Sequence, residues 1–337
     1  MYSWKWNLDE IENDKKVKVF STFSCGGGSS MGYKRAGFEV IGNCEIDPKI
    51  NEMYKLNNHP KYNYLMDLRD FNSLDDLPEE LYQLDILDGS PPCSTFSQAG
   101  VRDKSWGKVK KFREGQKEQR LDNLFFVYLD TVEKLRPKIS IAENVTGIIQ
   151  GKARGYCNEI INRYHELGYS VQIFKLNAAH MNVPQRRERI FFIANNQNYS
   201  KLVLNFNYQP ITFGEVRSDK GIEINHNTTI YRMAQRAVYG DRKLSHVCKR
   251  ERNKDSMYTL RLLYDDLVPG TLVAGTRDIR FCDREFTSDQ DIINMSTFPQ
   301  DYNFCDNNPN YVCGMSVPPN MMANIASEIW RQWLCKN

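Results

Sequence analysis

The sequence lacks several features, and each absence excludes a class of protein. No run approaches about 18 apolar residues, so we expect no helix that spans a membrane. The N-terminal stretch has neither an apolar core nor a small-residue cleavage site, so we expect no signal peptide. Internal repeats and low-complexity tracts are also missing. With 41% hydrophobic and 26% charged residues, the 337-residue chain is predicted to be a cytoplasmic globular protein with one large and one smaller domain.

The nine cysteines follow no pattern of paired spacing, and no C-x-x-C occurs. This argues against a zinc ribbon, a thioredoxin-type redox site and a disulfide framework. We therefore expect reduced thiols and no metal site. Cys93 is a candidate for chemistry because it directly follows two prolines, whereas the other cysteines are expected to be small packing residues.

An excess of one charge is also absent, because 45 basic residues balance 42 acidic ones and the net charge is only +3. Total charge therefore does not indicate a nucleic-acid-binding protein, and such an argument must depend on where the basic residues lie. Many of them are concentrated at 102–120, together with Trp106 and Phe112. This segment is either a solvated charged loop or a mobile clamp that closes on phosphates.

Short apolar runs alternate with helical patterns over the first two-thirds of the chain. Strands are expected at 17–23, 39–47, 62–68, 84–90, 138–145, 169–178 and 186–195. Helices are expected at 30–37, 48–58, 122–137 and 155–168. This alternation predicts an α/β fold with a doubly wound, mostly parallel sheet.

The pattern changes near residue 196, where the chain becomes polar and irregular. An amphipathic helix is expected again at 316–334. We predict a catalytic domain at 1–197, completed by 312–337, and a smaller irregular or β-rich domain at 198–311.

A glycine-rich loop, "FSCGGGSSMG" at 23–32, follows the first expected strand. Glycines let the backbone turn sharply and approach a ligand closely. Glu45, at the end of the second strand, could accept both ribose hydroxyls of a nucleoside, and Asp67, after the third, could accept an adenine amino group. The dinucleotide fingerprint G-x-G-x-x-G and the P-loop lysine are both missing. A nucleoside without a phosphate tail therefore fits best, and S-adenosylmethionine is such a ligand.

Cys93 lies in "GSPPCSTFS", directly after the fourth expected strand. Pro91 and Pro92 fix φ and remove two backbone donors, so the thiol is expected on a rigid turn at the sheet edge where ligands bind. "AENV" at 142–145 would bring Glu143 to the same edge, and "QRRER" at 185–189 enters a later strand. Taken singly, these motifs could be a buried structural cysteine, a solvated strand end and a surface salt-bridge cluster.

Seven motifs together resemble the ordered motifs of the DNA (cytosine-5) methyltransferases: "FSCGGGSSMG", "CEID", "MDL", "GSPPCSTFS", "AENV", "QRRER" and "GMSVPP". The resemblance covers nearly the whole chain except about 198–270, and it is greatest to bacterial and bacteriophage members. It implies a Rossmann-like S-adenosylmethionine-dependent domain and a target recognition domain at 198–311. The expected activity is DNA methylation by base flipping, which yields 5-methylcytosine at a short sequence, as in restriction-modification systems. A monomer in the bacterial cytoplasm or nucleoid, or in a phage-infected cell, is also implied.

The resemblance assigns roles to the candidate residues. Cys93 would add as a thiolate to C6 of cytosine, and protonated Glu143 would contact N3. Arg189 would hold O2, and Arg187 the nearby phosphate backbone. Positions implied to bind S-adenosyl-L-methionine and its product S-adenosyl-L-homocysteine are Phe23, Ser24, Gly26, Gly27, Glu45, Ile46, Asp67, Leu68, Pro92, Leu124, Ser316 and Val317. Positions implied to bind DNA are Ser97, Gln98, Lys108, Lys110, Lys111, Arg113, Asn144 and Gln185.

Basic residues of the recognition segment are further candidates for DNA contact, although each would more often be an ordinary surface charge. They are Arg232, Arg236, Arg242, Lys243, Lys249, Arg250 and Arg252. Motifs of this segment do not transfer between family members, so no target sequence is predicted.

Three positions depart from the family pattern. Cys25 replaces a glycine, so we expect an ordinary φ there. Met315 replaces an asparagine near the base pocket. Gln290 and Asp291 replace an arginine–glutamate pair, which puts the internal packing of the recognition segment in doubt.

Three alternatives remain open. A relative with the same mechanism could methylate a transfer RNA cytosine. A non-catalytic DNA-binding relative is disfavoured because Cys93 and Glu143 are both present. A redox or nicotinamide-dependent enzyme is disfavoured because the dinucleotide fingerprint is missing.

Overall fold

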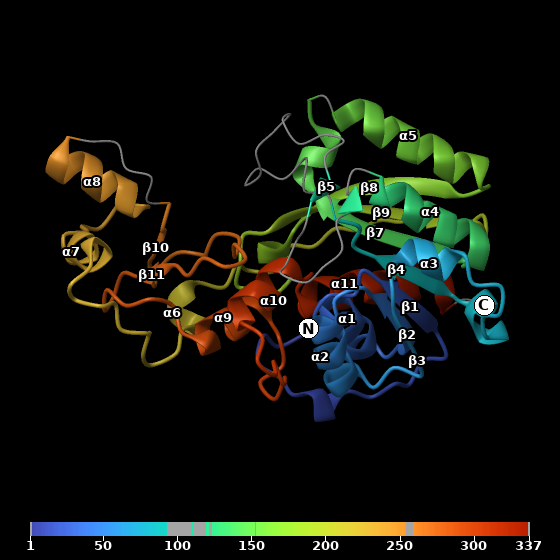
Figure 1. Cartoon of the computed structure of the whole chain (residues 1–337), viewed down its shortest axis with the longest axis horizontal. Coiled ribbons are helices and arrows are strands. Elements are labelled where there is room, and N and C mark those ends of the chain that lie inside the picture. The colour runs from blue at the N-terminus through green and yellow to red at the C-terminus, as the bar shows by residue number, and fades with distance from the viewer. Residues whose placement is uncertain are drawn as a thin grey trace. The chain divides into compact units, whose positions relative to one another are not determined.

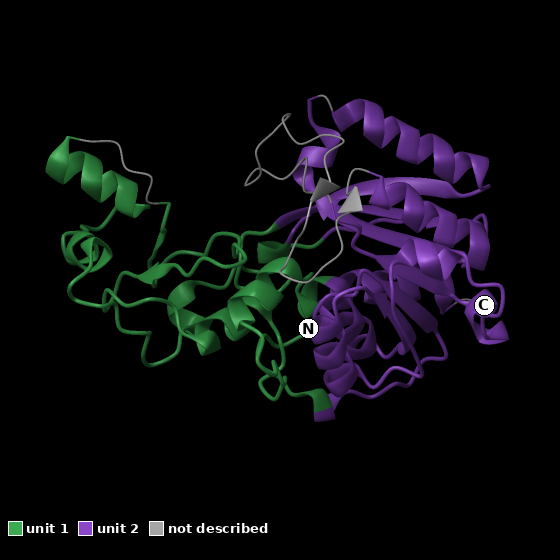
Figure 2. Ribbon diagram, in the orientation of Figure 1, with its two compact units in different colours: residues 1–8, 178–187, 206–321 green, residues 9–177, 188–205, 322–337 purple. Residues whose placement is uncertain are grey.

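The computed structural model describes residues 2–92, 109–110, 119–120, 123–151, 153–253 and 259–335, with backbone only at 109–110 and 119–120. Two compact units divide the chain (Figure 2). Unit 1 comprises Met1–Leu8, Ala178–Arg187 and Phe206–Met321, and unit 2 comprises Asp9–Asn177, Glu188–Asn205 and Met322–Asn337. Compared with the domain boundaries expected from the sequence, unit 1 also takes in 1–8, 178–187 and 312–321, while 198–205 belongs to unit 2.

Unit 2 contains a seven-stranded sheet in the order β3-β2-β1-β4-β7-β9-β8. Its strands are β1 (Lys18–Thr22), β2 (Glu39–Glu45), β3 (Tyr62–Leu65), β4 (Ile86–Gly89), β7 (Ile139–Val145), β8 (Ser170–Asn177) and β9 (Glu188–Asn195). β9 runs antiparallel to both of its neighbours, β7 and β8, and the other six strands of this sheet all run in the same direction. The predicted doubly wound, mostly parallel sheet is therefore confirmed. The strand order reverses between β1 and β4, and this is the edge position where such sheets bind ligands.

The helices of unit 2 are α1 (Gly28–Arg35), α2 (Pro48–Asn58), α3 (Leu68–Asn72), α4 (Leu124–Leu135) and α5 (Ala153–Glu166). Figure 1 shows α3, α4 and α5 on one face of the sheet, where Phe20, Leu87 and Phe192 share a core with residues of these helices. Helix α4 buries a nearly continuous apolar surface and ends at Arg136, because the following Pro137 disfavours a helical residue before it. On the opposite face, Tyr33 of α1 contacts Asp88 of β4.

A short antiparallel pair, β5 (Val109–Lys110) and β6 (Gln119–Arg120), lies within the lysine-rich segment. The sequence did not predict these strands. The described part of unit 2 also includes helical turns at Glu79–Gln83 and Thr146–Ile149, while Leu8–Glu10 spans the division and Ala178–His180 belongs to unit 1.

Unit 1 is largely irregular, with short helices. These are α6 (Phe213–Val216), α7 (Thr229–Gln235), α8 (Leu244–Arg252), α9 (Asp289–Ser296) and α10 (Pro309–Met315). Its named strands, β10 (Leu262–Leu263) and β11 (Ile279–Arg280), have two residues each. The irregular character is confirmed, but the β-rich alternative is wrong for the described residues. Helical spacing explains the difference, since Leu244, Val247 and Cys248 of α8 all face one small core.

The expected C-terminal helix is present as α11 (Pro319–Ile329), which begins in unit 1 and continues in unit 2. A π-helical turn at Trp330–Leu334 extends it. Among the helices that the structure describes, none is long and apolar enough to cross a membrane.

Candidate cofactor and active site

The glycine-rich loop connects β1 to α1 through several residues with positive φ. Phe23, Cys25 and Gly27 have φ of 51°, 45° and 76°. The expectation of an ordinary φ at Cys25 is therefore wrong, because the loop uses the left-handed region at alternate positions. An L-residue in this region costs about 1–2 kcal/mol. The backbone N–H of Cys25 also donates to Oε2 of Glu45 at 2.9 Å, which helps to hold this conformation.

Glu45, at the end of β2, receives three backbone hydrogen bonds. Besides Cys25, the N–H groups of Ile46 and Asp47 donate to Oε1 at 2.9 and 3.0 Å. Burial raises the pKa of Glu45, while these three donors act in the opposite direction. Because Oε2 accepts only one of the three bonds, its second lone pair can accept a ribose hydroxyl. The chemistry of Glu45 thus fits the nucleoside expected from the sequence.

An asparagine cluster lies under the same loop and was not anticipated from the sequence. Asn43 of β2 donates to Oγ of Ser24 at 3.1 Å and to Oδ1 of Asn51 at 3.2 Å. Asn63 of β3 donates to Oδ1 of both Asn43 and Asn51, at 2.7 Å each. Because three asparagines from three elements satisfy one another, the predicted cofactor residue Ser24 is fixed in place.

Asp67 caps α3 rather than standing free for a ligand. Its Oδ1 accepts from the backbone N–H of Arg69 at 2.8 Å, and its Oδ2 pairs with the Arg69 guanidinium at 3.1 Å. The neighbouring Leu68 and the first residue of α4, Leu124, are both buried in the core beside it. An adenine amino group would therefore share Asp67 with Arg69.

Glu143 and Arg189 lie together near the carboxyl end of β4. Nε of Arg189 is 2.8 Å from Oε1 of Glu143, and both side chains are largely buried. They project from the same face of the sheet, since Glu143 is paired with Phe191 and Arg189 with Val145 across β7 and β9. The structure thus brings together two of the four predicted catalytic residues.

Asn144, predicted to contact DNA, is buried and instead tethers the turn before Cys93. Its Nδ2 donates to the carbonyl of Pro91 at 3.2 Å, and its Oδ1 accepts from the N–H of Val145 at 2.9 Å. Asn144 therefore fixes the end of β4 against β7, next to the partly buried Pro92.

Gln185 and Arg187, predicted to bind DNA and its phosphates, are also buried, with 1% and 2% exposed surface. Both belong to unit 1 and hydrogen-bond to other residues of that unit. Ser316 and Val317 are buried in unit 1 as well, and Oγ of Ser316 has no hydrogen-bond partner among the described residues. A buried hydroxyl in this state is suited to a polar ligand.

The remaining predicted residues of the active site lie outside the described residues. These are Cys93, Ser97, Gln98, Lys108, Lys111 and Arg113. Of Lys110, only the backbone in β5 is described. Within the described part of the chain, no cluster of His, Cys, Asp and Glu could hold a metal ion.

Asp88 of β4 is a buried carboxyl that was not predicted from the sequence. The Ser21 hydroxyl donates to Oδ2 at 2.9 Å, and the Tyr33 hydroxyl donates to Oδ1 at 3.1 Å. Burial raises the pKa of Asp88 to about 7, and the charge of Glu143 acts in the same direction. Its position inside an otherwise apolar strand run gave the only signal that could have identified it.

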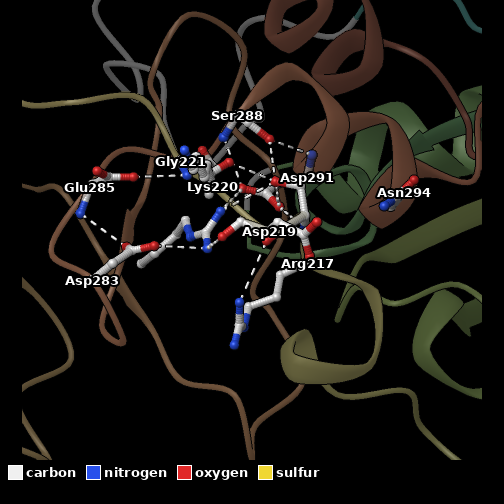
Figure 3. A network of polar contacts seen from close by, with 12 residues as sticks. Arg217, Asp219, Lys220, Gly221, Asp283, Glu285, Ser288, Asp291 and Asn294 are labelled. Atoms are coloured by element: carbon white, nitrogen blue, oxygen red, sulfur yellow. Dashed lines mark hydrogen bonds and ion pairs between the residues drawn. The ribbon is translucent and has the colours of Figure 1, made fainter.

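Where Gln290 and Asp291 replace the expected arginine–glutamate pair, Asp291 supplies the carboxylate and Arg280 supplies the cation. Asp291 of α9 accepts from the N–H group of Ser288 at 2.8 Å (Figure 3). It also accepts from the N–H group of Ser218 at 2.6 Å, and Arg280 of β11 lies 3.4 Å from it. Arg280 also pairs with Asp283 at 2.8 Å. Both Arg280 and Asp291 are fully buried. The packing that the sequence put in doubt is therefore built around Arg280 and Asp291.

The cations of the recognition segment fall into two groups. Arg250 pairs with Asp241 at 2.5 Å, and Arg236 with Glu251 at 3.6 Å. The others, which have no carboxylate partner among the described residues, are Arg232, Arg242, Lys243, Lys249 and Arg252. Met315, at the end of α10, is 42% exposed.

Comparison with known proteins places this fold and these motifs in one family. Residues 17–331 match the family model described as C-5 cytosine-specific DNA methylase. The type II methyltransferase M.FnuDI of Fusobacterium nucleatum is 35% identical over 177 residues, which are 52% of this chain and 46% of that protein. The orphan methyltransferase M.Rho11sI of Bacillus phage rho11s is 31% identical over 181 residues, 53% of this chain and 33% of that protein.

The chain spans less than half the length of these two curated relatives. A crystal structure of a prophage-encoded methyltransferase from E. coli superimposes with a TM-score of 0.66 at 20% identity, covering 94% of this chain and 99% of that one. At this identity the likeness supports the fold alone. Because the family model extends over most of the sequence, the chain belongs to the C-5 cytosine-specific DNA methylase family.

Proposed function

We propose that this chain is a DNA cytosine-5 methyltransferase that uses S-adenosyl-L-methionine. The observation that carries the proposal is the Glu143–Arg189 pair, 2.8 Å apart. Glu143 lies on β7, next to the strand β4 that leads into Pro91, Pro92 and Cys93, and Arg189 lies on β9, the strand beyond β7. A carboxyl group and a guanidinium at this position can contact N3 and O2 of one cytosine ring, while a thiol attacks C6.

The cofactor part of the proposal depends on the loop between β1 and α1. Glu45 offers a carboxylate oriented by three backbone donors, and Ser24 is held by Asn43. Asp67 provides a further polar group in unit 2. Ser316, in unit 1, stays a predicted cofactor residue on the strength of its motif, and its buried hydroxyl has no hydrogen-bond partner among the described residues. S-adenosyl-L-methionine, when bound, supplies the methyl group as an electrophile and leaves as S-adenosyl-L-homocysteine.

The reaction would begin with the Cys93 thiolate forming a bond to C6 of a cytosine that has been flipped out of the duplex. A hydrogen bond or proton from Glu143 to N3 stabilises the charge that this addition places on the ring. C5 then becomes the nucleophile and takes the methyl group. Loss of the C5 proton to a base and departure of the thiolate restore the aromatic ring as 5-methylcytosine.

This sequence of steps requires the Glu143–Arg189 pair to rearrange. The hydrogen bond to N3 must come from the protonated acid, whereas Glu143 faces the guanidinium of Arg189. We therefore propose that entry of the base draws Arg189 to O2, and that Glu143, released from the guanidinium, takes up a proton from solvent and donates it to N3.

Double-stranded DNA is the proposed partner, and no target sequence is assigned. The basic segment at 102–120 and the exposed cations of α8 supply the positive charge that a phosphate backbone needs. A monomer is proposed, because one such chain can enclose one target base by itself.

The direct test is transfer of labelled methyl groups to mixed-sequence duplex DNA, followed by bisulfite sequencing, with Cys93→Ser in parallel. We expect label in cytosines of one recurrent short sequence with the wild type and none with the variant. Transfer to RNA instead of DNA would favour the transfer RNA alternative. Binding of cofactor without transfer to either nucleic acid would contradict the proposed activity and favour a non-catalytic relative.

A further inference from the structure

We propose that Arg187 is a positioning residue for the segment that carries Ser316 and Val317, rather than a contact to DNA phosphates. The inference rests on the proposed function only in taking these two residues as part of the cofactor site. It reverses the role expected for Arg187 from the motif "QRRER". The contacts that support this role all lie within unit 1.

The guanidinium of Arg187 holds the end of α10. Both terminal nitrogens, Nη1 and Nη2, donate to the carbonyl oxygen of Gly314 at 3.1 Å. This carbonyl lies two residues before Ser316, at the point where α10 ends and the chain turns. Because the guanidinium is planar and two of its nitrogens donate to the same carbonyl oxygen, both the distance and the direction of that oxygen are fixed.

Gly314 also packs closely against the backbone of Ala274. A Cβ added there would lie 2.8 Å from the backbone nitrogen of Ala274, so the two backbones are in close contact. The N–H of Ser316 donates back to the carbonyl of Val312 at 3.1 Å. Together these contacts restrict the position of the segment 314–317 within unit 1.

Gln185 makes further hydrogen bonds within unit 1. Its Oε1 accepts from the N–H of Leu272 at 3.1 Å, and its Nε2 donates to the carbonyl of Met295 at 3.3 Å. Between the two residues, the N–H of Arg186 donates to the carbonyl of Pro269 at 2.8 Å. The segment 185–187 therefore connects α9, α10 and the 269–274 stretch.

The consequence of these contacts is seen at Ser316. Its side chain is 3% exposed, and its Oγ has no hydrogen-bond partner among the described residues. A buried hydroxyl without a protein partner costs free energy unless a ligand provides the hydrogen bond. Arg187 thus stabilises, through Gly314, a polar atom that is free to bind a ligand.

The two possible roles of Arg187 predict different effects of its substitution on cofactor binding and on DNA binding. A phosphate contact contributes about 0.9 to the slope of log K against log salt concentration, so its removal must lower that slope. A residue that positions Ser316 changes the affinity for cofactor and leaves the slope unchanged. With only 2% of its surface exposed, Arg187 is placed for the second role.

The experiment measures the Kd for S-adenosyl-L-homocysteine without DNA, and the salt dependence of DNA binding, for Arg187→Gln, Ser316→Ala and the double variant. Arg187→Gln removes the positive charge, so it would lower the salt slope if Arg187 contacted a phosphate. We expect each single change to weaken cofactor binding about tenfold. Because Arg187 acts through the segment that carries Ser316, the double variant should lose less than the product of the two effects. The DNA salt slope of Arg187→Gln should equal that of the wild type.

Lys249→Ala serves as the matched control, with a lower salt slope and unchanged cofactor affinity. Should Arg187→Gln fail to fold, Ser316→Ala still tests the premise, because its Oγ makes no hydrogen bond to the described residues. A lower slope for Arg187→Gln, or unchanged cofactor affinity in both single variants, would overturn the proposal. Cofactor affinity is measured without DNA, so failure of the proposed methylation leaves this result interpretable.

Discussion

Cys25 places a side chain where the backbone favours glycine. Its φ of 45° lies in the left-handed region, next to Phe23 at 51°. The strain is tolerated because the N–H of Cys25 is needed by Glu45, which in turn orders the start of α2 through Asp47. Local strain of this kind often accompanies ligand-binding loops.

Cys25→Gly should raise the free energy of unfolding by about 0.5–1 kcal/mol, because relief of the left-handed strain exceeds the extra freedom of glycine in the unfolded chain. Cys25→Val should lower it, since a β-branched residue is least compatible with this region. Urea denaturation of the three proteins measures both changes. Equal stability of the valine and glycine variants would show that the backbone there is not strained.

Asp88 is a titrating group enclosed by the sheet and α1. The Ser21 hydroxyl donates to it, and the ionisable groups around it are Tyr33 of α1, Tyr54 of α2, Tyr128 of α4 and Glu143 of β7. Burial and the Asp88 charge raise the pKa of Tyr33, so this hydroxyl stays neutral and donates. The carboxyl therefore has donors for its charged form but no cation beside it among the described residues.

The pKa of Asp88 is raised from 3.8 to about 7. The folded protein thus binds more protons than the unfolded chain between these values, and the contribution of Asp88 to stability falls as the pH rises through this window. Asp88→Asn cannot ionise, so the stability of the wild type relative to this variant should fall from pH 4 to pH 7, by up to about 1.4 kcal/mol per unit. Urea denaturation at several pH values tests this. A difference that does not vary with pH would contradict it.

Helix α8 carries two kinds of cation on neighbouring positions. Lys249 is exposed and has no carboxylate partner among the described residues, whereas Arg250 is tied to Asp241 at 2.5 Å and to the carbonyl of Arg236 at 2.6 Å. The partnered arginine fixes the helix within unit 1. The unpartnered lysine is available to a phosphate.

Lys249→Ala should weaken DNA binding and lower the salt slope by about 0.9, the value for one phosphate contact. Arg250→Ala, one residue further along α8, should leave the slope unchanged, because its partners are protein groups. Binding measured over a range of salt concentrations distinguishes the two. The opposite pattern would assign the contact to Arg250 and remove Lys249 from the DNA surface.

Local sequence patterns predicted the strands of the large sheet and four helices of unit 2, but not α3, β5 or β6. Apolar runs identified every strand of the large sheet, and Pro48 and Pro137 correctly indicated where α2 begins and α4 ends. The antiparallel direction of β9 could also have been predicted from the sequence. Only residues 178–187 separate β8 from β9, and a crossover to a parallel strand needs a dozen or more residues, usually including a helix.

Features that depend on contacts distant in the sequence were not predictable. Asp88 and Ser21 are 67 residues apart, and no local pattern indicates that one meets the other. Gln185 and Arg187 have the letters of a surface motif, yet their partners Leu272, Met295 and Gly314 lie far along the chain. The motifs identified the family because they contain the residues that its chemistry requires. The burial of a side chain, in contrast, depends on the whole fold.

The buried ion pair of unit 1 limits how target specificity could be transplanted between relatives. A chimera joined between Arg280 and Asp291 would take the two buried charges from different parents, and a mismatched partner would leave one charge alone. Removing one member of such a pair typically costs about 3–5 kcal/mol. Ser218 and Asp283 belong to the same network, so a graft should carry 217–221 and 280–291 from a single donor.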